Sequence, residues 1–592
     1  MQYKTTDNKF TVKQNGERDR DQEVLCNFVA EIIKETIIID GMTERTIFTI
    51  KGESQKRKFK TIEVTAEKFA SLSWITSNWG ATAVVFPGSG IASDLRTAIQ
   101  ILSENIETEY IYQHTGWTEI DEKPAYLHGN GAITENGNND AIRVEMPADL
   151  SRYELPSTDA LSQEEKKRCF ESSVRLIFLA EPSKIAPLLA ATWRACIDAA
   201  DFAVHCTGRS GSFKSEVTSL MQSHYGQKMD ARNLPGSWNS TANALEALAY
   251  RAKNALFVID DFIPVGTSWQ QKQYQGNADR IMRAQGNQQG RARLTDVSSL
   301  QQTMYPRGLV MSSGEDTPEG QSLRGRMMII ELSKGDVKVD KLTECQARRR
   351  DLPIAMAGFI QWLARGREAK LEHFHQYRME VRDRNRGVGH ARTPQMIGDL
   401  VATVEMFMMY GVATNCITED ESAEYQTLFE KAIETTANDQ TRFIVESDPS
   451  ETFVKVLQSA FMAKRVHVVA MDGGSPKFPL LVGWNENRSS TVYEYQPRGT
   501  KIGWIDEEKN SLYIDHAIGY EELRKQSSGQ ISITSSTLWK RLRESGVINR
   551  HDENRQRSTV RLTCEGSMKT VVCIDLSKII EVEEDDSEQQ PF

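Results

Sequence analysis

The feature that most constrains the fold of this chain is a glycine-containing segment, GRSGSFKS at Gly208–Ser215. It follows an apolar run, Phe202–Cys206, and precedes a helix-compatible stretch, Glu216–Gln222. A strand, a loop with glycines and a helix in this order turn backbone N–H groups toward a phosphate, and the positive end of the helix favours the anion. Lys214 would then reach the β- and γ-phosphates of a nucleotide, and the Ser215 hydroxyl would bind Mg²⁺. The predicted nucleotide-contacting residues are Gly208, Arg209, Ser210, Gly211, Ser212, Phe213, Lys214 and Ser215.

The loop departs from the usual phosphate-loop pattern, G-x-x-x-x-G-K-[ST], at one position. Phe213 stands where the last glycine is expected, and Gly211 supplies flexibility two residues earlier. The alternative interpretation is a polar turn between a buried strand and a helix, with Lys214 solvated.

A second apolar run, Ala255–Ile259, leads directly into two acids, Asp260 and Asp261. Such a run is typical of a central parallel strand that is covered on both faces. Acids at the carboxyl end of a strand lie where ligands bind in open α/β sheets. We therefore predict that Asp260 holds Mg²⁺ together with Ser215, and that Asp261 is the base for the attacking water. A strand that simply ends in an acidic turn is the alternative.

A third predicted strand, Gly308–Met311, ends in two hydroxyl residues. A hydroxyl that leaves a strand beside the other two is the expected place for a sensor of the γ-phosphate, with Ser313 the first choice and Ser312 the second. Two arginines follow, Arg324 and Arg326, ahead of another apolar run. Either is a candidate for a finger that stabilises charge in the transition state, and ordinary surface arginines are the alternative.

Length and composition limit the class of protein. The 592 residues are enough for several domains, and a hydrophobic content of 39% with 26% charged residues fits a soluble globular chain. The net charge of −10 argues against a surface coated in positive charge, although a local basic channel could still hold DNA. The eight cysteines contain no CxxC pair, so we expect no disulfide framework, no zinc site and a reducing cytoplasm. No apolar run suggests a membrane span.

Alternation of strand-like and helix-like stretches predicts an α/β multidomain protein. We expect a mixed α/β domain over residues 1–150, an ATPase core over 151–345 and a helical lid or linker over 346–440. A C-terminal region over 441–592 would end in a disordered acidic tail.

The C-terminal region carries a separate signal. Residues 535–547 predict a capped amphipathic helix with Leu538, Trp539 and Leu542 buried, and two β-like stretches follow around a turn at Glu565-Gly566. A helix with a hairpin predicts a winged helix at about 510–577. The predicted DNA-binding residues of this module are Lys540, Arg541 and Arg543. A winged helix that contacts protein instead is the alternative.

A long insertion between the acidic strand and the sensor strand is rich in arginine. Insertions of this length between two strands of one sheet are usually functional. Arg291 and Arg293 are predicted on a hairpin that projects into a pore and grips DNA phosphates, with a solvated loop as the alternative. The basic run Arg378–Arg392 is predicted to be a solvated linker.

These motifs, taken in order, resemble the domain-of-unknown-function 927 family of bacterial mobile elements, phages and plasmids. The segments that carry the resemblance are HTGW at His114–Trp117, YLHG at Tyr126–Gly129, TGRSGSFKS at Thr207–Ser215, LPGSW at Leu234–Trp238, STANAL at Ser240–Leu245, DDF at Asp260–Phe262, QGN at Gln285–Asn287, YPRG at Tyr305–Gly308, SGED at Ser313–Asp316 and GQSLR at Gly320–Arg324. The family is similar to mobile-element replicative helicases that resemble minichromosome maintenance helicases.

The resemblance implies an AAA+ ATPase assembled as a ring, in most such cases a hexamer, with ATP between subunits. Lys214, Ser215, Asp260 and Asp261 would come from one subunit, and Arg324 or Arg326 from its neighbour. Phe213 looks usual within the family, whereas Asp261 replaces the more common glutamate. The resemblance also implies a pore hairpin and a DNA-binding collar at the N-terminus.

The resulting hypothesis is a cytoplasmic, ATP- and Mg²⁺-dependent DNA helicase or translocase that serves replication of a mobile element. Its DNA would be single-stranded or forked and bound without sequence preference, and a primase is a possible partner. One rival is a non-helicase AAA+ loader, remodeller or defence ATPase. The other is a sequence-specific replication initiator that works mainly through its winged helix.

Overall fold

The computed structural model describes residues 3–15, 22–41, 43–264, 266–290, 293–294, 300–301, 303–446, 448–489, 492–527, 531, 533–552 and 557–580. It divides into two compact units. The core unit holds Met1–Pro318 and Arg326–Asn438, and the C-terminal unit holds Glu319–Gly325 and Asp439–Phe592. The chain therefore passes between the units three times, after residues 318, 325 and 438.

A five-stranded parallel sheet lies at the centre of the core unit, in the order β14-β15-β18-β13-β19. Its strands are β13 (Ala203–Thr207), β14 (Gly236–Ser237), β15 (Leu256–Phe262), β18 (Leu309–Gly314) and β19 (Met327–Glu331). The apolar residues of β13, β15 and β18 are fully buried, which is the pattern of strands covered on both faces. The predicted α/β class with a parallel sheet is confirmed, and β18 runs three residues beyond the predicted Met311.

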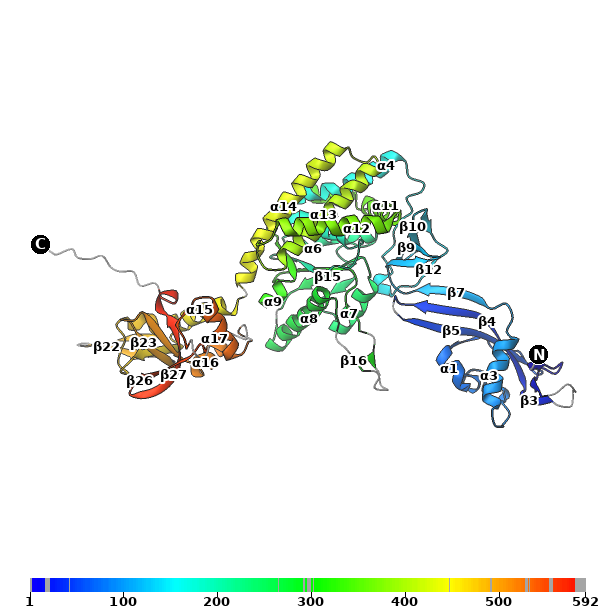
Figure 1. The fold of residues 1–592 in the computed structure, drawn as a ribbon, viewed down its shortest axis with the longest axis horizontal. Helices are drawn as coiled ribbons and strands as arrows, with labels where there is room; N and C mark the ends of the chain where they lie inside the picture. The colour runs from blue at the N-terminus through cyan, green and yellow to red at the C-terminus, as the bar shows by residue number, and fades with distance from the viewer. Residues whose placement is uncertain are drawn as a thin grey trace. The chain divides into compact units, whose positions relative to one another are not determined.

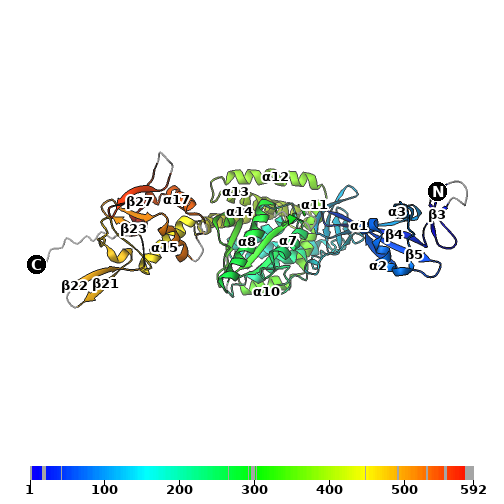
Figure 2. The same cartoon turned by 90° about the horizontal axis from the view of Figure 1, so that it is seen from below.

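Helices cover both faces of this sheet. On one face, α5 (Pro182–Arg194) and α6 (Lys214–Gln222) contact each other and the strands; on the other, α7 (Ala242–Arg251) and α8 (Ser268–Asn287) do the same. Figure 1 shows α6 above β15 and α7 and α8 below it, and Figure 2, seen from below, brings α7 and α8 to the front. Thr267 begins α8 with a capping box to Gln270, which stabilises its first turn.

The part of the chain predicted to be a helical lid or linker, 346–440, is made of helices. It begins at the end of α10 (Val339–Ala347) and holds α11 (Asp351–Ala364), α12 (Arg367–Arg384), α13 (Thr393–Ala413) and α14 (Glu419–Glu446). Within the described residues, α13 is long and apolar enough to cross a membrane by length and composition, but 78% of its apolar window is buried in the unit. That burial is the property of a core helix.

The N-terminal part of the core unit contains three further sheets. A mixed sheet has the order β12-β7-β4-β5-β6, a meander has the order β11-β10-β9-β8, and a small antiparallel sheet has the order β1-β2-β3. Their bounds, with the helices beside them, are β1 (Tyr3–Thr5), β2 (Thr11–Gln14), β3 (Gln22–Cys26), β4 (Phe28–Ile39), β5 (Glu44–Ser54), β6 (Ile62–Thr65), α1 (Ala66–Ser71), α2 (Ser73–Trp79), α3 (Ile91–Leu102), β7 (Glu107–Tyr112), β8 (Gly116–Ile120), β9 (Lys123–His128), β10 (Gly131–Thr134), β11 (Gly137–Asn139), β12 (Arg143–Val144) and α4 (Gln163–Val174). The Tyr126 hydroxyl on β9 donates to the carbonyl of Asn254 at 2.6 Å, so the meander is tied to the turn before β15.

The C-terminal unit is built on one six-stranded sheet, in the order β20-β23-β24-β27-β25 with β26 paired to β27. Its elements are α9 (Gln321–Arg324), α15 (Pro449–Met462), β20 (Val466–Ala470), β21 (Trp484–Ser489), β22 (Val492–Pro497), β23 (Thr500–Asp506), β24 (Ser511–Asp515), α16 (Ile518–Gln526), α17 (Ser535–Glu544), β25 (Ile548–Arg550), β26 (Val560–Cys564) and β27 (Ser567–Asp575). The predicted helix is α17, and its predicted apolar residues Leu538, Trp539 and Leu542 are buried in the core of the unit.

The predicted hairpin is also present, as β26 and β27. Glu565 and Gly566 between them both have positive φ, 49° and 73°, which is the two-residue turn that matches the twist of a hairpin. The hairpin is part of a larger sheet that also contains β20, β23, β24 and β25, and α17 contacts this sheet at β25. The acidic tail, 581–592, lies outside the described residues.

A candidate phosphate-binding site at the carboxyl edge of the core sheet

The predicted phosphate loop connects β13 to α6 at the carboxyl edge of the core sheet. Gly208 donates its N–H to the carbonyl of Gly314 at 3.1 Å, which fixes the loop to the end of β18. A Cβ at Gly208 would lie 2.1 Å from the carbonyl oxygen of Leu332, so only glycine fits there. Gly211 has a φ of 83°, a conformation that costs other residues energy. The two glycines are therefore required for different reasons, close approach and backbone conformation.

Phe213, the departure from the usual pattern, has a backbone conformation that favours glycine. Its φ and ψ are 62° and 17°, in the left-handed region, and it is the N-cap of α6. A bulky residue with positive φ is uncommon and strained. The Phe213 side chain is 40% exposed, so it gains little burial in return. The loop thus keeps the geometry of a phosphate loop at an energetic cost.

The loop contains a polar atom that is suited to an anion. The Ser212 side chain is 1% exposed, and its Oγ has no hydrogen-bond partner among the described residues. A buried hydroxyl without a partner is costly, and it is satisfied when a ligand oxygen accepts its proton. The first N–H groups of α6, which begins at Lys214, point toward the same loop. These donors fit a phosphate group.

Asp260 accepts hydrogen bonds from two hydroxyl groups beside the predicted metal position. Its Oδ1 accepts a hydrogen bond from Ser215 Oγ at 3.0 Å and another from Ser313 Oγ. One residue from each of three segments, α6, β15 and β18, therefore meets the others at Asp260 Oδ1. Across the described part of the chain, Oδ2 of Asp260 receives no hydrogen bond and is available to a cation.

The donor set suits Mg²⁺ that arrives with a nucleotide. Among the described residues, no group of three or more His, Cys, Asp or Glu side chains could hold a metal ion alone. Mg²⁺ prefers a few protein oxygens completed by phosphate and water, which is what Ser215 and Asp260 offer beside the loop.

Asp261 lies in an irregularity of β15. The register between β15 and β18 shifts between Ile259 and Phe262, and Asp261 has a φ of 71°. Such bulges occur beside active sites, where they redirect side chains. Burial, followed by the negative charge of Asp260, raises the pKa of the Asp261 carboxyl, and the charge of Lys214 opposes this shift. A raised pKa improves a carboxylate as a proton acceptor.

The structure distinguishes the two candidate sensors on β18. Successive side chains of a strand point to opposite faces, and Ser313 points to Asp260 while Ser312 points away from it. Ser312 Oγ accepts a hydrogen bond from Trp238 Nε1 at 2.9 Å and lies 3.1 Å from His205 Nδ1. We did not predict a role for either residue: Trp238 ends the LPGSW segment, which carries no chemistry of its own, and His205 lies inside the apolar run before the loop.

The two predicted finger arginines have different surroundings. Arg324 belongs to the C-terminal unit, where its Nη1 donates to the carbonyl of Phe443 at 2.8 Å. Arg326 belongs to the core unit, where its Nε and Nη2 both lie 3.2 Å from Asn287 Oδ1. Its aliphatic part packs against Gly286, where a Cβ would lie 2.7 Å from the Arg326 Cδ.

The arginine-rich insertion, where we predicted a pore hairpin, contains a short antiparallel pairing. β16 (Arg293–Leu294) pairs with β17 (Leu300–Gln301), and Figure 1 shows β16 below α7, at the lower edge of the core unit. Arg291 lies outside the described residues, and only the backbone of Arg293 is described.

The basic residues predicted to bind DNA on α17 have protein partners. Arg541 Nη1 donates to Gln321 Oε1 at 3.1 Å, and Lys540 Nζ lies 3.8 Å from Glu544 one turn along the helix. The basic run in the helical region is also engaged, because Arg378 lies 3.5 Å from the buried Asp399. Part of the predicted linker is therefore packed into the core unit.

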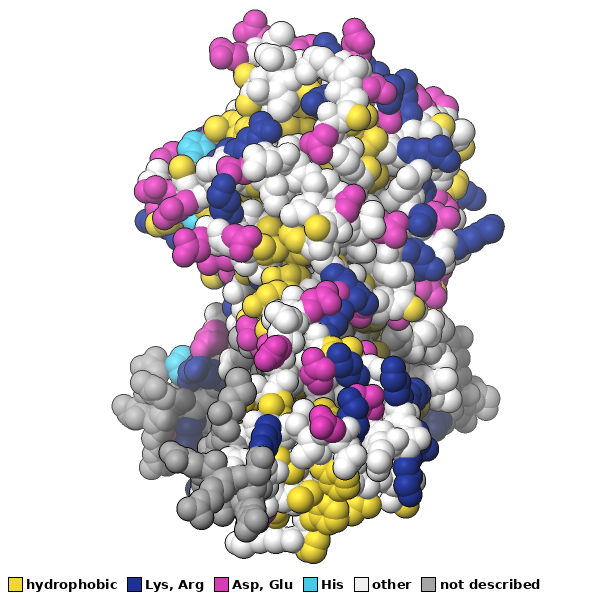
Figure 3. All heavy atoms as spheres, turned by 90° about the vertical axis from the view of Figure 1, so that its right-hand side faces the viewer, with side chains coloured by type: hydrophobic (Ala, Val, Ile, Leu, Met, Phe, Trp, Pro, Cys, Tyr) yellow, Lys and Arg dark blue, Asp and Glu magenta, His cyan; other side chains and the backbone are white. Residues whose placement is uncertain are grey.

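The N-terminal sheets present mixed charge. Figure 3 shows basic and acidic side chains interspersed on this face of the molecule. Glu109 on β7 bridges two cations, with Lys34 at 2.7 Å and Arg143 at 2.8 Å. Lys51 similarly pairs with Glu31 on the neighbouring strand at 2.9 Å. Much of the positive charge of this region is thus balanced locally.

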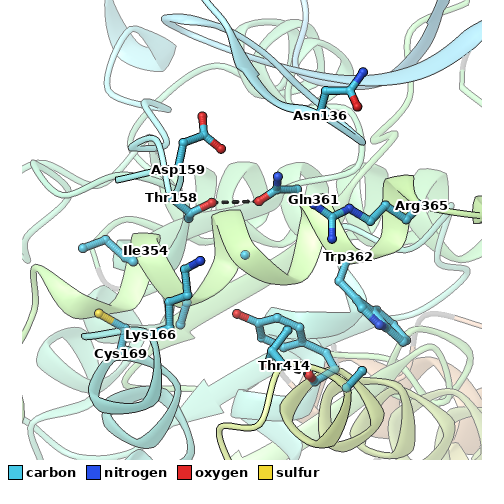
Figure 4. A pocket seen from close by; sticks show the side chains of 14 residues that line it. Asn136, Thr158, Asp159, Lys166, Cys169, Ile354, Gln361, Trp362, Arg365 and Thr414 are labelled. Carbon is cyan, nitrogen blue, oxygen red and sulfur yellow. Dashed lines mark hydrogen bonds between the residues drawn. The ribbon is translucent and has the colours of Figure 1, made fainter. Parts of the chain in front are cut away.

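A separate pocket of about 350 Å³ is lined by residues of α4, α11 and α13 and by the loops before α4. Figure 4 shows the hydrogen bond that crosses it, from Thr158 Oγ1 to Gln361 Oε1 at 2.8 Å, with Lys166 on one side and Trp362 and Arg365 on the other. Its described lining residues include none of those predicted to bind nucleotide or DNA. The phosphate loop is therefore the better candidate site, because its polar groups converge on one point.

Comparisons with known proteins identify a shared fold and a family. The chain shares its fold with the solved structure described as "SCCmec type IV Cch - active helicase", with a TM-score of 0.51 and 12% sequence identity over 98% of each chain. A comparison with curated protein sequences found no match. Residues 6–296 match the model of the family described as "Domain of unknown function (DUF927)", which confirms the resemblance to this family that the motifs predicted.

Proposed function

We propose that the protein is an ATP-dependent DNA helicase or translocase with a P-loop core of the AAA+ type. The observation that carries the proposal is the meeting of Ser215, Asp260 and Ser313 beside a loop with a buried, unpartnered Ser212 hydroxyl. A hydroxyl, a carboxylate and a sensor hydroxyl at one sheet edge are the parts that hydrolysis of a nucleoside triphosphate needs. The position of β18 between β13 and β15 supports the AAA+ type.

Each residue has a distinct role in this proposal. The loop N–H groups, Ser212 and Lys214 bind the phosphates of ATP, and Mg²⁺ held by Ser215 and Asp260 supplies neutralisation of the developing charge. Asp261 accepts a proton from the attacking water. Ser313, on β18, contacts the γ-phosphate and so senses whether it is present. Arg324 or Arg326 of a neighbouring subunit would stabilise the transition state, in a ring that we propose to be a hexamer.

The shared fold supports DNA as the partner of the protein. The fold is shared, over nearly the whole chain, with a structure described as an active helicase. The β16–β17 hairpin would grip the phosphate backbone, and the α17 module would act as a winged helix. The N-terminal sheets would form a collar. A mobile genetic element, with or without a primase, is the setting that the family resemblance supports.

Unwinding of a labelled forked DNA duplex by the purified protein with ATP and Mg²⁺ tests the proposal. We expect strand release by the wild type and none by Lys214→Ala, because the lysine binds the phosphates that are transferred. Lys228→Ala is the matched control: Lys228 is exposed and pairs with Glu154 at 3.2 Å. ATP hydrolysis without strand release would replace the helicase with a loader or remodeller, and equal hydrolysis by Lys214→Ala would refute the ATP site itself.

A further inference from the structure

The segment Glu319–Gly325 leaves the core unit between β18 and β19 and folds as part of the C-terminal unit. It begins shortly after Ser313, the proposed sensor, and contains α9 with Arg324, a proposed finger. A helix of four residues cannot be stable alone, because too few hydrogen bonds compensate its nucleation. Its position therefore depends on contacts outside the helix, and those of Gln321 and Arg324 are with the C-terminal unit.

Gln321 is the residue through which α9 is held. Its Nε2 donates to Asp448 Oδ2 at 3.3 Å, and its Oε1 accepts the hydrogen bond from Arg541 Nη1 at 3.1 Å. Asp448 is itself fixed as the N-cap of α15, where Oδ1 accepts from the N–H of Ser450 at 2.8 Å. The Gln321 amide is thus bound at both ends, by α15 and by α17.

Arg324 is oriented by a third contact. Its guanidinium donates to the carbonyl of Phe443, in the last turn of α14, where carbonyls lack partners within the helix. Leu323, one residue earlier, is fully buried. With Gln321 held on one side and Leu323 buried on the other, the backbone of α9 places Arg324 precisely enough for a role in catalysis.

We propose that Arg541 is a positioning residue for ATP hydrolysis: through Gln321 it fixes α9 and the finger Arg324, so that the C-terminal unit controls the ATPase. The inference rests on the proposed function, and it gives Arg541 a role toward protein in place of the predicted DNA contact. Because α9 lies between β18 and β19, any change in how α17 holds Gln321 moves the segment that joins the sensor strand to the finger.

ATP hydrolysis by Arg541→Ala and Gln321→Ala, measured without DNA on the full chain, tests the inference. We expect each to lower kcat about tenfold with an unchanged KM for ATP, the effect of one lost charge-assisted hydrogen bond. The double variant should be no worse than either single one, because both changes remove the same contact. Arg541→Lys, which keeps a donor, should recover part of the activity.

Two controls separate positioning from folding and from DNA binding. Arg524→Ala changes an exposed arginine of α16 in the same unit, 3.9 Å from Glu521, and should leave kcat unchanged. In mixtures with Lys214→Ala subunits, Arg541→Ala should regain activity as Arg324→Ala does, since the partner subunit then supplies a correctly placed finger. A merely structural defect would not be repaired by mixing.

The outcomes are distinguishable. Wild-type kcat for Arg541→Ala, with weakened affinity for DNA, would overturn the inference and restore the DNA contact. Failure of Arg541→Ala to regain activity in mixtures where Arg324→Ala does so would also overturn it. Equal hydrolysis by the wild type and Lys214→Ala would instead refute the proposed function, and this inference with it.

Discussion

The phosphate loop and the α9 segment hold the two halves of the proposed active site, and they are built in different ways. At the loop, Ser215, Asp260 and Ser313 meet because parallel strands end at the same edge of one sheet. At α9, the position of Arg324 depends on residues more than a hundred positions later in the chain. Phe443 binds Arg324 itself, and Asp448 and Arg541 bind Gln321 in the same helix. The first arrangement follows from the order of the strands in one sheet. The second depends on residues of the C-terminal unit, and a change in that unit can therefore regulate it.

The largest effect should come from the metal position at the loop. Asp260→Asn removes the carboxylate charge while it keeps the shape, and should lower kcat for ATP hydrolysis roughly a thousandfold, since a metal contributes several kcal/mol of transition-state stabilisation. If the hydrolysis rate of this variant stays within a few-fold of wild type at saturating Mg²⁺, Asp260 does not hold the metal.

A smaller loss is expected at the proposed base. Asp261→Asn should lower kcat about a hundredfold, as loss of a general base does. The carboxylate must be ionised to accept a proton, so its raised pKa means that activity is lost as pH falls through a range above that of an ordinary aspartate. The pH profile of kcat measures this: the acid limb of the wild type should disappear in Asp261→Asn.

The same raised pKa predicts the opposite effect on folding. The protonated form is favoured in the folded state, so the ionised Asp261 lowers stability at neutral pH. Asp261→Asn should therefore melt no lower than the wild type at pH 7. A lower melting temperature would show that the ionised carboxylate of Asp261 stabilises the fold, against the raised pKa.

The paired serines of β18 separate activity from stability. Ser313→Ala should lower kcat about tenfold, because a hydrogen bond to a charged group is lost. Ser312→Ala should spare kcat but lower the free energy of unfolding by about 1–3 kcal/mol, since buried polar groups of Trp238 and His205 lose a partner. Steady-state kinetics and chemical denaturation of both variants test the assignment, and exchanged phenotypes would reverse it.

The smallest effect is expected at the strained loop position. Phe213→Gly should leave ATP hydrolysis within about twofold and raise stability slightly, since glycine adopts positive φ without the cost of 1–3 kcal/mol borne by other residues. Phe213→Val should lower stability by about 1–2 kcal/mol, because β-branched residues tolerate this conformation least. If valine were tolerated as well as glycine, the strain at this position would be negligible.

Much of the loop half could be predicted from sequence. Apolar runs that end in polar residues identified β13, β15 and β18, and the rule that parallel strands end together then placed Ser215, Asp260 and Ser313 in one site. Alternation along β18 could also have excluded Ser312, had the strand been extended to Gly314.

The contacts of α9 could not be predicted from the sequence, because they join residues that lie far apart in the chain and share no sequence pattern. Arg541 resembles a DNA-binding residue in its own helix, and only the tertiary structure shows its hydrogen bond to Gln321. The conformation of Phe213 could not be predicted for a different reason: a bulky side chain argues against positive φ, yet Phe213 adopts it as the N-cap of α6.

The three passages of the chain between units bear on how the protein could be shortened. A fragment that stops near residue 438 would retain Glu319–Gly325 but lose Phe443, Asp448 and Arg541, the hydrogen-bond partners of this segment. The converse fragment, 439–592, would lack Gln321, the hydrogen-bond partner of Arg541. Because the chain runs through the core unit, the C-terminal unit, the core unit and the C-terminal unit in turn, no single cut separates the two units completely.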